Sequence, residues 1–457
     1  MGAAALKFFV LACLAGFPLA LSHDVGGPLA LVAFVPLFWL ARHGERVFWL
    51  GALAGFTEVF IAMWGCSSYG YIIPLILALQ GAVVRGLACW LLRHRGVLAG
   101  LSMVVVGQWI RTLPPLSIPI SVGHDLVAWP SLAQPAALGG GALLVWICAL
   151  SSYAVVDRFV RPRLLLLLVL IYSVSGLYAA WVPPRGEATA VRISAIQGGL
   201  PNWVYAQSWI DPKARQLIRR RYLAVAEAEA ERGAELVILP ESAVREDWPG
   251  QNPMAQTYRE IHDRGVGLIA GINSRRDGEW RNSALAWPAK QAEPITVEKR
   301  IIVPIVERAF RAGDSEPQLL PFKKLALALC IESIYPGIFA SMPKARWGLV
   351  ITNDAGVGSA TPRRAFERET RLRALEQGLP ILRVAQDGRS YLVAANGAIV
   401  DELPEHLPGV LRLTSLPARR WTLYGQLGNW LAWLSLVILV LRLRRRPSGH
   451  GPTPASA

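Results

Sequence analysis

The sequence predicts a multispan α-helical membrane domain joined to an α/β domain, and its composition gives the two main reasons. Of 457 residues, 53% are hydrophobic and only 17% are charged, which is too apolar for an ordinary soluble protein. Charges are scarce over Leu6–Val182, whereas Pro184–Arg420 has the composition of a soluble domain. A last apolar run, Trp430–Leu443, precedes a basic tail, so we expect the soluble part to be attached to the membrane at both ends.

The apolar segments that are candidate transmembrane helices follow one another along the chain. They are Leu6–Leu21, Leu29–Ala41, Val47–Gly65, Tyr71–Leu92, Val97–Ile110, Ala136–Val156, Leu164–Val182 and Trp430–Leu443. An upright span needs roughly 20 apolar residues, so the first, second, fifth and last segments are short, and we expect about eight spans. The expected domains are 1–183 with about seven spans, the soluble domain 184–425, a final span over 426–446 and a tail over 447–457.

Arginines between these segments predict the orientation of the chain. They lie on every second connection and after the last segment, at Arg42, Arg46, Arg93, Arg95, Arg158, Arg161, Arg163, Arg442, Arg444, Arg445 and Arg446. The alternate connections, Ser22–Pro28, Cys66–Gly70 and Thr112–Pro135, contain no lysine or arginine. Because positive charge stays on the cytoplasmic side, the soluble domain is expected outside the cytoplasm and the tail inside it.

The formal net charge of +15 does not indicate a nucleic-acid partner, because much of it lies in these arginines and no basic stretch is interleaved with aromatic residues. Two further charges, Glu58 and Arg85, fall within candidate spans. Intramembrane charges are often functional, but a mutual structural pair is an equally good interpretation.

The soluble domain alternates strand and helix patterns. The expected strands are Val191–Ile196, Glu235–Leu239, Gly267–Ala270, Asn282–Trp287, Pro294–Glu298, Leu325–Leu329, Gly348–Ile351, Ile381–Val384 and Ser390–Val393. The expected helices are Pro212–Arg232, Gln256–Arg264 and Glu367–Gln377. This alternation predicts an α/β domain whose sheets are covered by helices.

The apolar run Leu325–Leu329 leads directly into Cys330, and Glu332 follows two positions later. Such a run predicts a buried strand, so the cysteine would be held at the edge of a sheet, where a nucleophile could be placed. Most free cysteines are instead small buried hydrophobic residues. Cys330 is the only cysteine of the soluble part, in a compartment expected to be oxidising, which makes a purely structural role less attractive.

Glu241 and Lys299 end two other expected strands in the same way. A thiol nucleophile needs a base and a positive group that stabilises the developing anion. Strands ending in Glu241, Lys299 and Cys330 could bring the three side chains together at one edge of a sheet. Taken singly, each is more often a solvated strand end. His262, an alternative base, lies within a helix pattern and is expected on a solvated face.

These residues, in this order, resemble the carbon–nitrogen hydrolase (nitrilase) superfamily, and within it most closely the membrane-embedded apolipoprotein N-acyltransferase family. The resemblance covers most of the chain. It is carried by Leu239–Glu241, Lys299 and Cys330–Glu332, together with Ala195–Gly198, Asn282–Ser283, Lys299–Pro304 with Glu307, Thr352–Asp354 and Arg373–Arg383. It implies that the soluble domain is a nitrilase-like αββα sandwich.

The resemblance also implies roles for the matching residues. Glu241 would be the general base, Cys330 the nucleophile that forms a thioester, and Lys299 the group that stabilises the tetrahedral intermediate. Glu307 and Glu332 would support the site, and Trp209, Asn353 and Asp354 would bind substrate. The implied donor is a phospholipid acyl chain, the acceptor the N-terminal amine of a lipoprotein, and the location the bacterial inner membrane. No cofactor is implied, and no metal-ligand cluster is visible.

Three stretches depart from the family pattern. Ala355–Gly358 stands where the family usually has Trp-Phe-Gly, Ser359–Phe366 lacks the usual histidine, and the usual Gly-Phe-Pro-Trp is not recognisable in Ile110–Pro130. Because these stretches would handle lipid or acceptor, three functions are open. They are an acyltransferase, a membrane-anchored amidase or nitrilase-type hydrolase, and a conjugal-transfer TraB-like envelope protein with a binding role.

Overall fold

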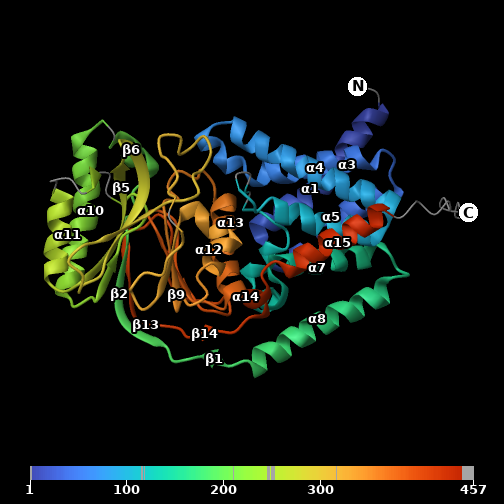
Figure 1. Ribbon diagram of the computed structural model, residues 1–457. Coiled ribbons are helices and arrows are strands. Elements are labelled where there is room, and N and C mark those ends of the chain that lie inside the picture. Colours follow the sequence, from blue (N-terminus) through green and yellow to red (C-terminus); the bar gives the residue numbers. More distant parts are fainter. Residues whose placement is uncertain are drawn as a thin grey trace, which may run out of the picture.

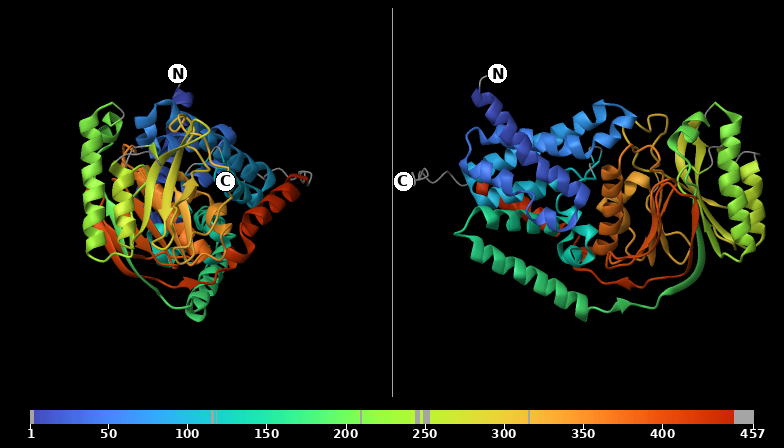
Figure 2. Two further views of the ribbon diagram at one scale, coloured as in Figure 1. Left: turned by 60° about the vertical axis from the view of Figure 1, so that its left-hand side comes forward. Right: turned by 180° about the vertical axis from the view of Figure 1, so that it is seen from behind.

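The computed structural model of the protein describes residues 3–114, 117, 119–208, 210–243, 247–248, 253–314 and 316–444. A bundle of apolar helices and an α/β sandwich lie side by side, with helix α13 (Ala360–Gln377) at their junction (Figure 1). Helices α10 (Pro212–Glu231) and α11 (Pro253–Asp263) lie on the side of the sandwich away from the bundle (Figure 2).

The bundle is built from residues before Val182 and from the last described helix. Its helices are α1 (Ala3–Val25), α2 (Val35–His43), α3 (Val47–Ala62), α4 (Ile72–Arg95), α5 (Val97–Ile110), α6 (Pro130–Ala133), α7 (Ala136–Val156), α8 (Arg161–Trp181) and α15 (Trp430–Arg444). Short 3-10 turns connect them at η1 (Gly27–Leu31), η2 (Trp64–Tyr69) and η3 (His124–Ala128). Among the described residues, 4 helices are long and apolar enough to cross a membrane: Leu6–Val25, Ile72–Arg95, Ala136–Val156 and Arg161–Trp181.

The first expected span, Leu6–Leu21, is longer in the structure than expected, whereas two others are broken or shortened. The segment Leu29–Ala41 is not one helix, because η1 ends at Leu31 and α2 begins only at Val35. A proline lies in the first turn of each piece, and proline lacks the N–H that a continuous helix would need. The expected span Val47–Gly65 ends at Ala62, before η2. The total of about eight spans stays a prediction.

Helix α8 lies at the periphery of the bundle, along the lower edge of the molecule in Figure 1, and packs against α7 on one side. Only 6% of the most apolar 18-residue stretch of α8 is buried, and Leu166 and Val169 are 70% and 62% exposed. Soluble proteins rarely expose so large an apolar surface, whereas lipid covers such a helix without cost. The exposed apolar surface of α8 therefore identifies the chain as an integral membrane protein.

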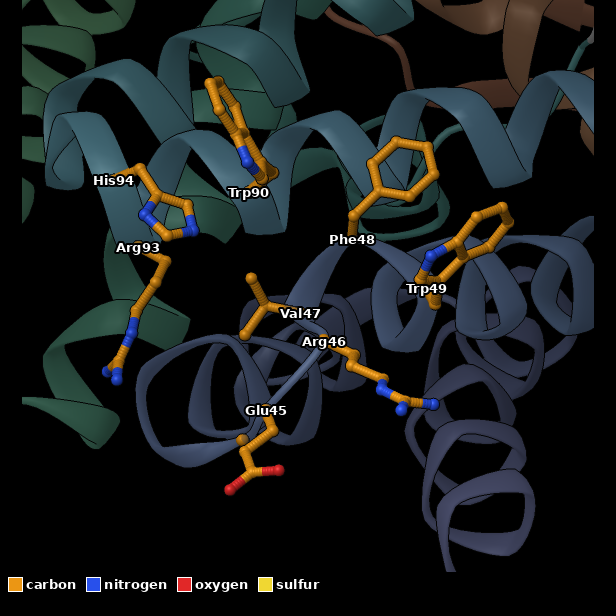
Figure 3. Close-up of a pocket in the computed structure, with 9 residues that line it drawn as sticks. Glu45, Arg46, Val47, Phe48, Trp49, Trp90, Arg93 and His94 are labelled. Carbon is orange, nitrogen blue, oxygen red and sulfur yellow. The ribbon is translucent and has the colours of Figure 1, made fainter. Parts of the chain in front are cut away.

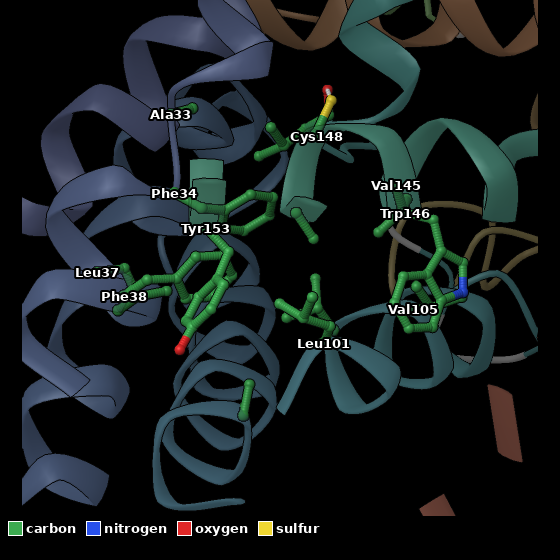
Figure 4. Packing of buried hydrophobic residues seen from close by; sticks show 14 of the residues in the cluster. Ala33, Phe34, Leu37, Phe38, Leu101, Val105, Val145, Trp146, Cys148 and Tyr153 are labelled. Atoms are coloured by element: carbon green, nitrogen blue, oxygen red, sulfur yellow. Dashed lines mark hydrogen bonds between the residues drawn. The ribbon is translucent and has the colours of Figure 1, made fainter. Parts of the chain in front are cut away.

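Glycines allow α3 and α4 to pack closely. A Cβ atom at Gly55 would lie 2.2 Å from the carbonyl oxygen of Gly81, and one at Gly51 would lie 2.5 Å from that of Arg85. Small residues permit this approach of membrane helices. Larger side chains, among them Phe38 of α2, fill the rest of the bundle interior (Figure 4).

The two intramembrane charges form a mutual pair. Arg85 donates hydrogen bonds to both carboxylate oxygens of Glu58, at 2.8 and 2.6 Å, and both residues are buried. His23 lies 3.3 Å from Glu58 and 2.8 Å from Asp125, and Arg368 of α13 donates to Asp125 at 2.8 Å. Since buried charges need partners, this row of ion pairs fixes the bundle against the sandwich.

The α/β part contains two main sheets. The seven-stranded sheet has the order β13-β2-β3-β5-β6-β7, with β4 paired to β5, and the five-stranded sheet has the order β12-β11-β10-β9-β8. The strands are β2 (Thr189–Gln197), β3 (Leu236–Ile238), β4 (Asp247–Trp248), β5 (Gly267–Arg276), β6 (Glu279–Trp287), β7 (Ile295–Glu298), β8 (Leu325–Leu329), β9 (Trp347–Thr352), β10 (Ile381–Ala385), β11 (Ser390–Val393), β12 (Ile399–Leu403) and β13 (Gly409–Leu416). A small third sheet pairs β1 (Pro184–Arg185) with β14 (Arg419–Arg420), where the chain enters and leaves the sandwich.

The two main sheets face each other across a shared apolar core, and helices cover both outer faces. Helices α10 and α11, with α9 (Asn202–Gln207), pack on the seven-stranded sheet. Helices α12 (Pro336–Ala340) and α13 pack on the five-stranded sheet, and α14 (Leu423–Leu427) leads towards α15. This confirms the expected αββα sandwich. The other side of α13 contacts the bundle, where Leu372 and Leu375 join the bundle core.

Strand β8 explains the unbroken apolar run in the sequence. Leu325, Leu327 and Leu329 point into the core between the sheets, while Ala326 and Ala328 pack on the side of α12. A strand covered on both faces needs apolar residues at every position. The strand is therefore rigidly held up to the point at which Cys330 begins.

Candidate active site

Three residues expected to carry the chemistry line one cavity. Glu241 follows β3, Lys299 follows β7 and Cys330 follows β8. The first two come from one sheet and the third from the other, so the cavity lies at the edge where the two sheets meet. The structure thus brings together the side chains that the sequence placed at strand ends.

Cys330 sits on a strained turn between β8 and the 3-10 turn η4 (Cys330–Ile334). Its φ angle of 49° lies in the left-handed region, which few non-glycine residues adopt. Ser333 donates a hydrogen bond to the carbonyl oxygen of Cys330 at 2.8 Å and closes the turn. Strain of this kind is concentrated at functional sites. The turn directs a half-buried thiol into the cavity.

The turn that carries Glu241 depends on a glycine from the neighbouring strand. Ser242 has a φ of 50°, and the turn lies directly against Gly271 of β5. A Cβ atom at Gly271 would be 2.3 Å from the carbonyl oxygen of Pro240. Any larger residue would therefore push the Glu241 turn away from the sheet.

Lys299 is held between two carboxylates. Its Nζ donates to Oε1 of Glu241 and to Oε1 of Glu307, each at 2.8 Å, and the lysine side chain is buried. Asn282 Nδ2 donates to the same two oxygens, also at 2.8 Å. A buried ammonium requires such compensation. The arrangement fixes one positive charge and one carboxylate beside the thiol.

The second oxygen of Glu241 is also held in place. It accepts a hydrogen bond of 2.9 Å from the backbone N–H of Asn353, at the end of β9. Charge-assisted hydrogen bonds of this kind are strong and short. Because both oxygens are fixed, the carboxylate has a defined orientation and keeps lone pairs that can accept a proton.

Glu307 and Glu332 hold the segments that surround the lysine. Glu307 Oε2 accepts from the backbone N–H of Val303 at 2.8 Å. Glu332 Oε1 accepts from the N–H of Arg300 at 2.7 Å and its Oε2 from that of Leu329 at 2.9 Å. Glu332 therefore links the residue after Lys299 to the residue before Cys330.

This bridge predicts the effect of Glu332→Gln. A glutamine has one acceptor oxygen, and its NH₂ group would face the other backbone N–H, so one donor loses its partner. We propose that Cys330 is the nucleophile, and we expect the rate at which substrate acylates it to fall about 10- to 100-fold, since misplacement by 1 Å has effects of this size. The rate of acyl-enzyme formation measures it, with the exposed Glu293→Gln as control. An unchanged rate in Glu332→Gln would show that the bridge is not needed.

The thiol is protonated at rest. Burial raises the pKa of Cys330 to about 12, and the negative charge of Glu241 raises it further, while Lys299 opposes this. Burial alone would lower the pKa of Lys299, but the charges of Glu241 and Glu307 outweigh burial and raise it well above its usual value. At neutral pH the cysteine therefore needs a base to become a nucleophile, and the lysine stays charged.

The cavity has a volume of about 680 Å³ and two kinds of wall. The polar wall comes from the sandwich and comprises Glu241, Asn273, Asn282, Lys299 and Cys330. The apolar wall comes from both parts of the molecule: Met63, Ile73, Ile76 and Leu77 belong to the membrane bundle, and Val303, Ile305, Val306 and Phe310 to the sandwich. The site is thus suited to a molecule with a reactive polar group and a long apolar part.

A second cavity, of about 560 Å³, lies where α3 begins and α4 ends (Figure 3). Its lining includes Arg46, Trp49, Trp90, Arg93 and His94, but no thiol or hydroxyl among the described residues. It therefore lacks the groups of a covalent acyl-transfer site. In the described part of the chain, no cluster of three or more His, Cys, Asp or Glu side chains is arranged to hold a metal ion.

The expected substrate-binding residues have different positions. Trp209 lies outside the described residues. Asn353 and Asp354 line the cavity. The Asp354 carboxylate accepts hydrogen bonds from Arg383 at 2.8 and 3.1 Å and from Thr352 at 2.9 Å, so the loop after β9 is tied to the five-stranded sheet.

Sequence reasoning missed two residues of the cavity. Asn282, noted only as part of a matching stretch, contacts both carboxylates beside Lys299. Its position inside an expected strand was the available signal, because an amide at a buried strand position needs polar partners. Tyr69, from the turn between α3 and α4 of the bundle, also lines the cavity. No local pattern connects Tyr69 to residues so distant in sequence.

Comparisons with known proteins agree with this arrangement. The family model described as Carbon-nitrogen hydrolase matches residues 197–414. Proteins named apolipoprotein N-acyltransferase from Azotobacter vinelandii, Gloeobacter violaceus and Pseudomonas aeruginosa (strain UCBPP-PA14) are 28%, 27% and 26% identical to the chain. The alignments cover 98%, 93% and 94% of this chain and 97%, 91% and 94% of the relatives.

Among solved structures, a carbon–nitrogen hydrolase from Helicobacter pylori G27 is 16% identical, with a TM-score of 0.41, and covers 56% of this chain and 95% of that one. An amidase from Nesterenkonia sp. is 22% identical, with a TM-score of 0.40, and covers 54% and 95%. The full-length matches, the family model and the sandwich agree. Residues 197–414 match the carbon–nitrogen hydrolase family, and over nearly its whole length the chain is similar to apolipoprotein N-acyltransferases.

Proposed function

We propose that the protein transfers an acyl chain from a phospholipid, through a thioester on Cys330, to the N-terminal amine of a lipoprotein. One observation carries the proposal. The cavity that contains Cys330, Glu241 and Lys299 is also lined by apolar residues of the membrane bundle, among them Met63, Ile73 and Leu77. A membrane-bound ester with a long acyl chain matches both walls of such a site.

In the first half of the reaction, Glu241 takes the thiol proton and the Cys330 sulfur attacks the ester carbonyl carbon. Lys299 stabilises the negative charge that develops on the carbonyl oxygen. When the tetrahedral intermediate collapses, the carbon–oxygen bond of the ester breaks, and the lysophospholipid oxygen takes the proton back from Glu241. The acyl chain is left on Cys330 as a thioester.

In the second half, the acceptor amine attacks the thioester carbonyl carbon and gives a proton to Glu241. Collapse of this intermediate breaks the carbon–sulfur bond and forms an amide, and the thiol regains its proton from Glu241. Glu307 and Glu332 have supporting roles, since they hold the segments beside Lys299. Asn353 positions Glu241 through its backbone N–H. Asp354 and Trp209 stay proposed substrate-binding residues.

Exposed apolar residues beside the cavity support access from the lipid side. Ile305 and Val306, in the turn closed by Glu307, are 50% and 37% exposed. Ile305 has a φ of 71°, which is rare for a β-branched residue. A strained turn that presents apolar side chains next to membrane helices suits contact with lipid acyl chains.

The arginine distribution supports a catalytic domain outside the cytoplasm. Arginines at the C-terminal end of α4 contact the ends of two other helices: Arg95 donates to the carbonyl oxygen of Leu443 in α15, and Arg93 to that of Arg42 in α2. Arg42 in turn pairs with Asp157, just after α7, so these charged helix ends lie together. The opposite ends of α3 and α4, at η2, contact the sandwich. By the positive-inside rule the arginine end is cytoplasmic, and the sandwich then faces the periplasm of a bacterial inner-membrane protein.

Product analysis tests transfer against hydrolysis. We expect the purified protein in vesicles, given labelled phospholipid and a diacylglyceryl-cysteine peptide, to form lysophospholipid and an N-acyl peptide in equal amounts. Free fatty acid without amide would contradict the proposal and favour a hydrolase. The matching test in vivo uses cells that depend on this protein for N-acylation of lipoproteins. Mass spectrometry of their lipoprotein N-termini should detect the added acyl chain.

A further inference from the structure

The turn η2 (Trp64–Tyr69) of the bundle is docked onto the loop Ala355–Gly358 of the sandwich. Ser68 Oγ donates to the carbonyl oxygen of Gly356 at 2.6 Å, and the N–H of Gly358 donates to the carbonyl oxygen of Gly65 at 2.9 Å. These two contacts join segments almost 300 residues apart. A part of the membrane domain is thereby fixed beside the active-site cavity, which Cys66, Tyr69 and Gly356 line.

Glycine at two positions makes this close contact possible. A Cβ atom at Gly65 would lie 2.1 Å from Oγ of Ser359, and one at Gly356 would lie 2.1 Å from the hydroxyl oxygen of Tyr69. Any side chain at residue 356 would therefore occupy the space of the phenol group. Gly356 lies in the stretch where the sequence departs from the family pattern, so this departure makes room for Tyr69.

The Tyr69 side chain lines the same cavity as Cys330, Glu241 and Lys299. It is half-buried, and within the described part of the chain its hydroxyl has no hydrogen-bond partner. Burial, followed by the nearby Cys330 and carboxylates, raises the pKa of Tyr69 above its ordinary value. The hydroxyl therefore stays protonated and is available as a donor.

The apolar wall beside Tyr69 indicates what the hydroxyl would meet. Ile73, Ile76 and Leu77 recur at helical spacing on one face of α4 and line the cavity next to the turn. An acyl chain packed on this face ends in an ester, whose oxygens accept hydrogen bonds. The acceptor amine is a poorer match, because its lone pair must stay free to attack the thioester.

We propose that Tyr69 is a substrate-binding residue of the acylation step, donating a hydrogen bond to an oxygen of the ester group of the acyl donor. The proposal rests on the proposed function, since it requires an ester substrate. The membrane domain then supplies part of the active site as well as the anchor. The hydroxyl orients the ester for attack by Cys330.

The variant Tyr69→Phe tests this, because it removes only the hydroxyl and keeps the ring that packs against Gly356. We expect the rate of Cys330 acylation by phospholipid, followed by intact-protein mass in vesicles, to fall about 10- to 100-fold. The matched control is Tyr71→Phe, two residues away and 72% exposed, which should acylate at the wild-type rate.

A second measurement separates substrate binding from a structural role. Alkylation of Cys330 by iodoacetamide needs no ester, so its rate should be equal in wild type and Tyr69→Phe. A Tyr69→Phe protein that is acylated at the wild-type rate, or that is slowed equally in acylation and alkylation, would overturn the proposal. Failure of the wild type to form any acyl-enzyme would instead overturn the proposed function, and with it the role of Tyr69.

Discussion

Glu241→Gln is expected to slow acylation of Cys330 by about 1,000-fold, which is typical for loss of a general base. Glutamine keeps the size of the side chain and an oxygen acceptor for Lys299 or the Asn353 N–H. It cannot take the thiol proton. Single-turnover formation of acyl-enzyme from labelled phospholipid measures the effect, and Glu260→Gln, on the exposed face of α11, is the matched control.

The same substitution should make the thiol more acidic. Burial is the main reason that the pKa of Cys330 lies at about 12, and the negative charge of Glu241 is the next. Removing that charge lowers the pKa of Cys330, so more of the thiol is ionised at a pH of about 8 to 9, below its pKa. Alkylation by iodoacetamide should therefore become faster in Glu241→Gln, although acylation becomes slower. Loss of both reactions would mean that Glu241→Gln disrupts the site, and an unchanged acylation rate would exclude Glu241 as the base.

Lys299→Met is expected to slow acylation by about 100- to 1,000-fold, the usual effect of removing a group that stabilises the oxyanion. Here the thiol pKa should move in the opposite direction. Lys299 opposes the rise caused by burial and Glu241, so its removal raises the pKa of Cys330 further and slows alkylation. The pH dependence of alkylation, compared with the exposed Lys290→Met, measures the shift.

Lys299→Met should also lower thermal stability. The carboxylates of Glu241 and Glu307 share Asn282 as a donor and would lose the cation between them. Breaking a buried ion pair by removing one partner commonly costs about 3–5 kcal/mol. A Lys299→Met protein that is acylated at the normal rate would contradict the assigned role. If such a protein were also less stable, Lys299 would have only a structural role.

The sequence predicted the parts of the site that depend on local patterns. The run Leu325–Leu329 has apolar residues at every position because both faces of β8 are covered, and this places Cys330 at a strand end. Glu241 follows the buried strand β3 in the same way, whereas Lys299 follows β7, an edge strand that is only partly buried. The αββα sandwich could be predicted because its alternation of strands and helices is regular and the family order agreed with it.

Features that depend on contacts between distant segments were not predictable from local patterns. The break in the expected span Leu29–Ala41 arises from two prolines whose effect on a membrane helix varies with its neighbours. The connection Thr112–Pro135 contains the turn η3, whose His124 and Asp125 are buried and pair with residues of α13. Only the folded arrangement of bundle and sandwich shows these pairs.

Formation of an acyl-enzyme on Cys330 is the most direct test of the central claim. The wild-type protein in vesicles should gain the mass of one acyl chain from labelled phospholipid, located on Cys330 by peptide mass spectrometry. Neutral hydroxylamine or an acceptor amine should remove it, as expected for a thioester. Cys330→Ala should show no label, and Cys13→Ala, changed in α1 away from the cavity, should label normally. Label that persists in Cys330→Ala would contradict the account.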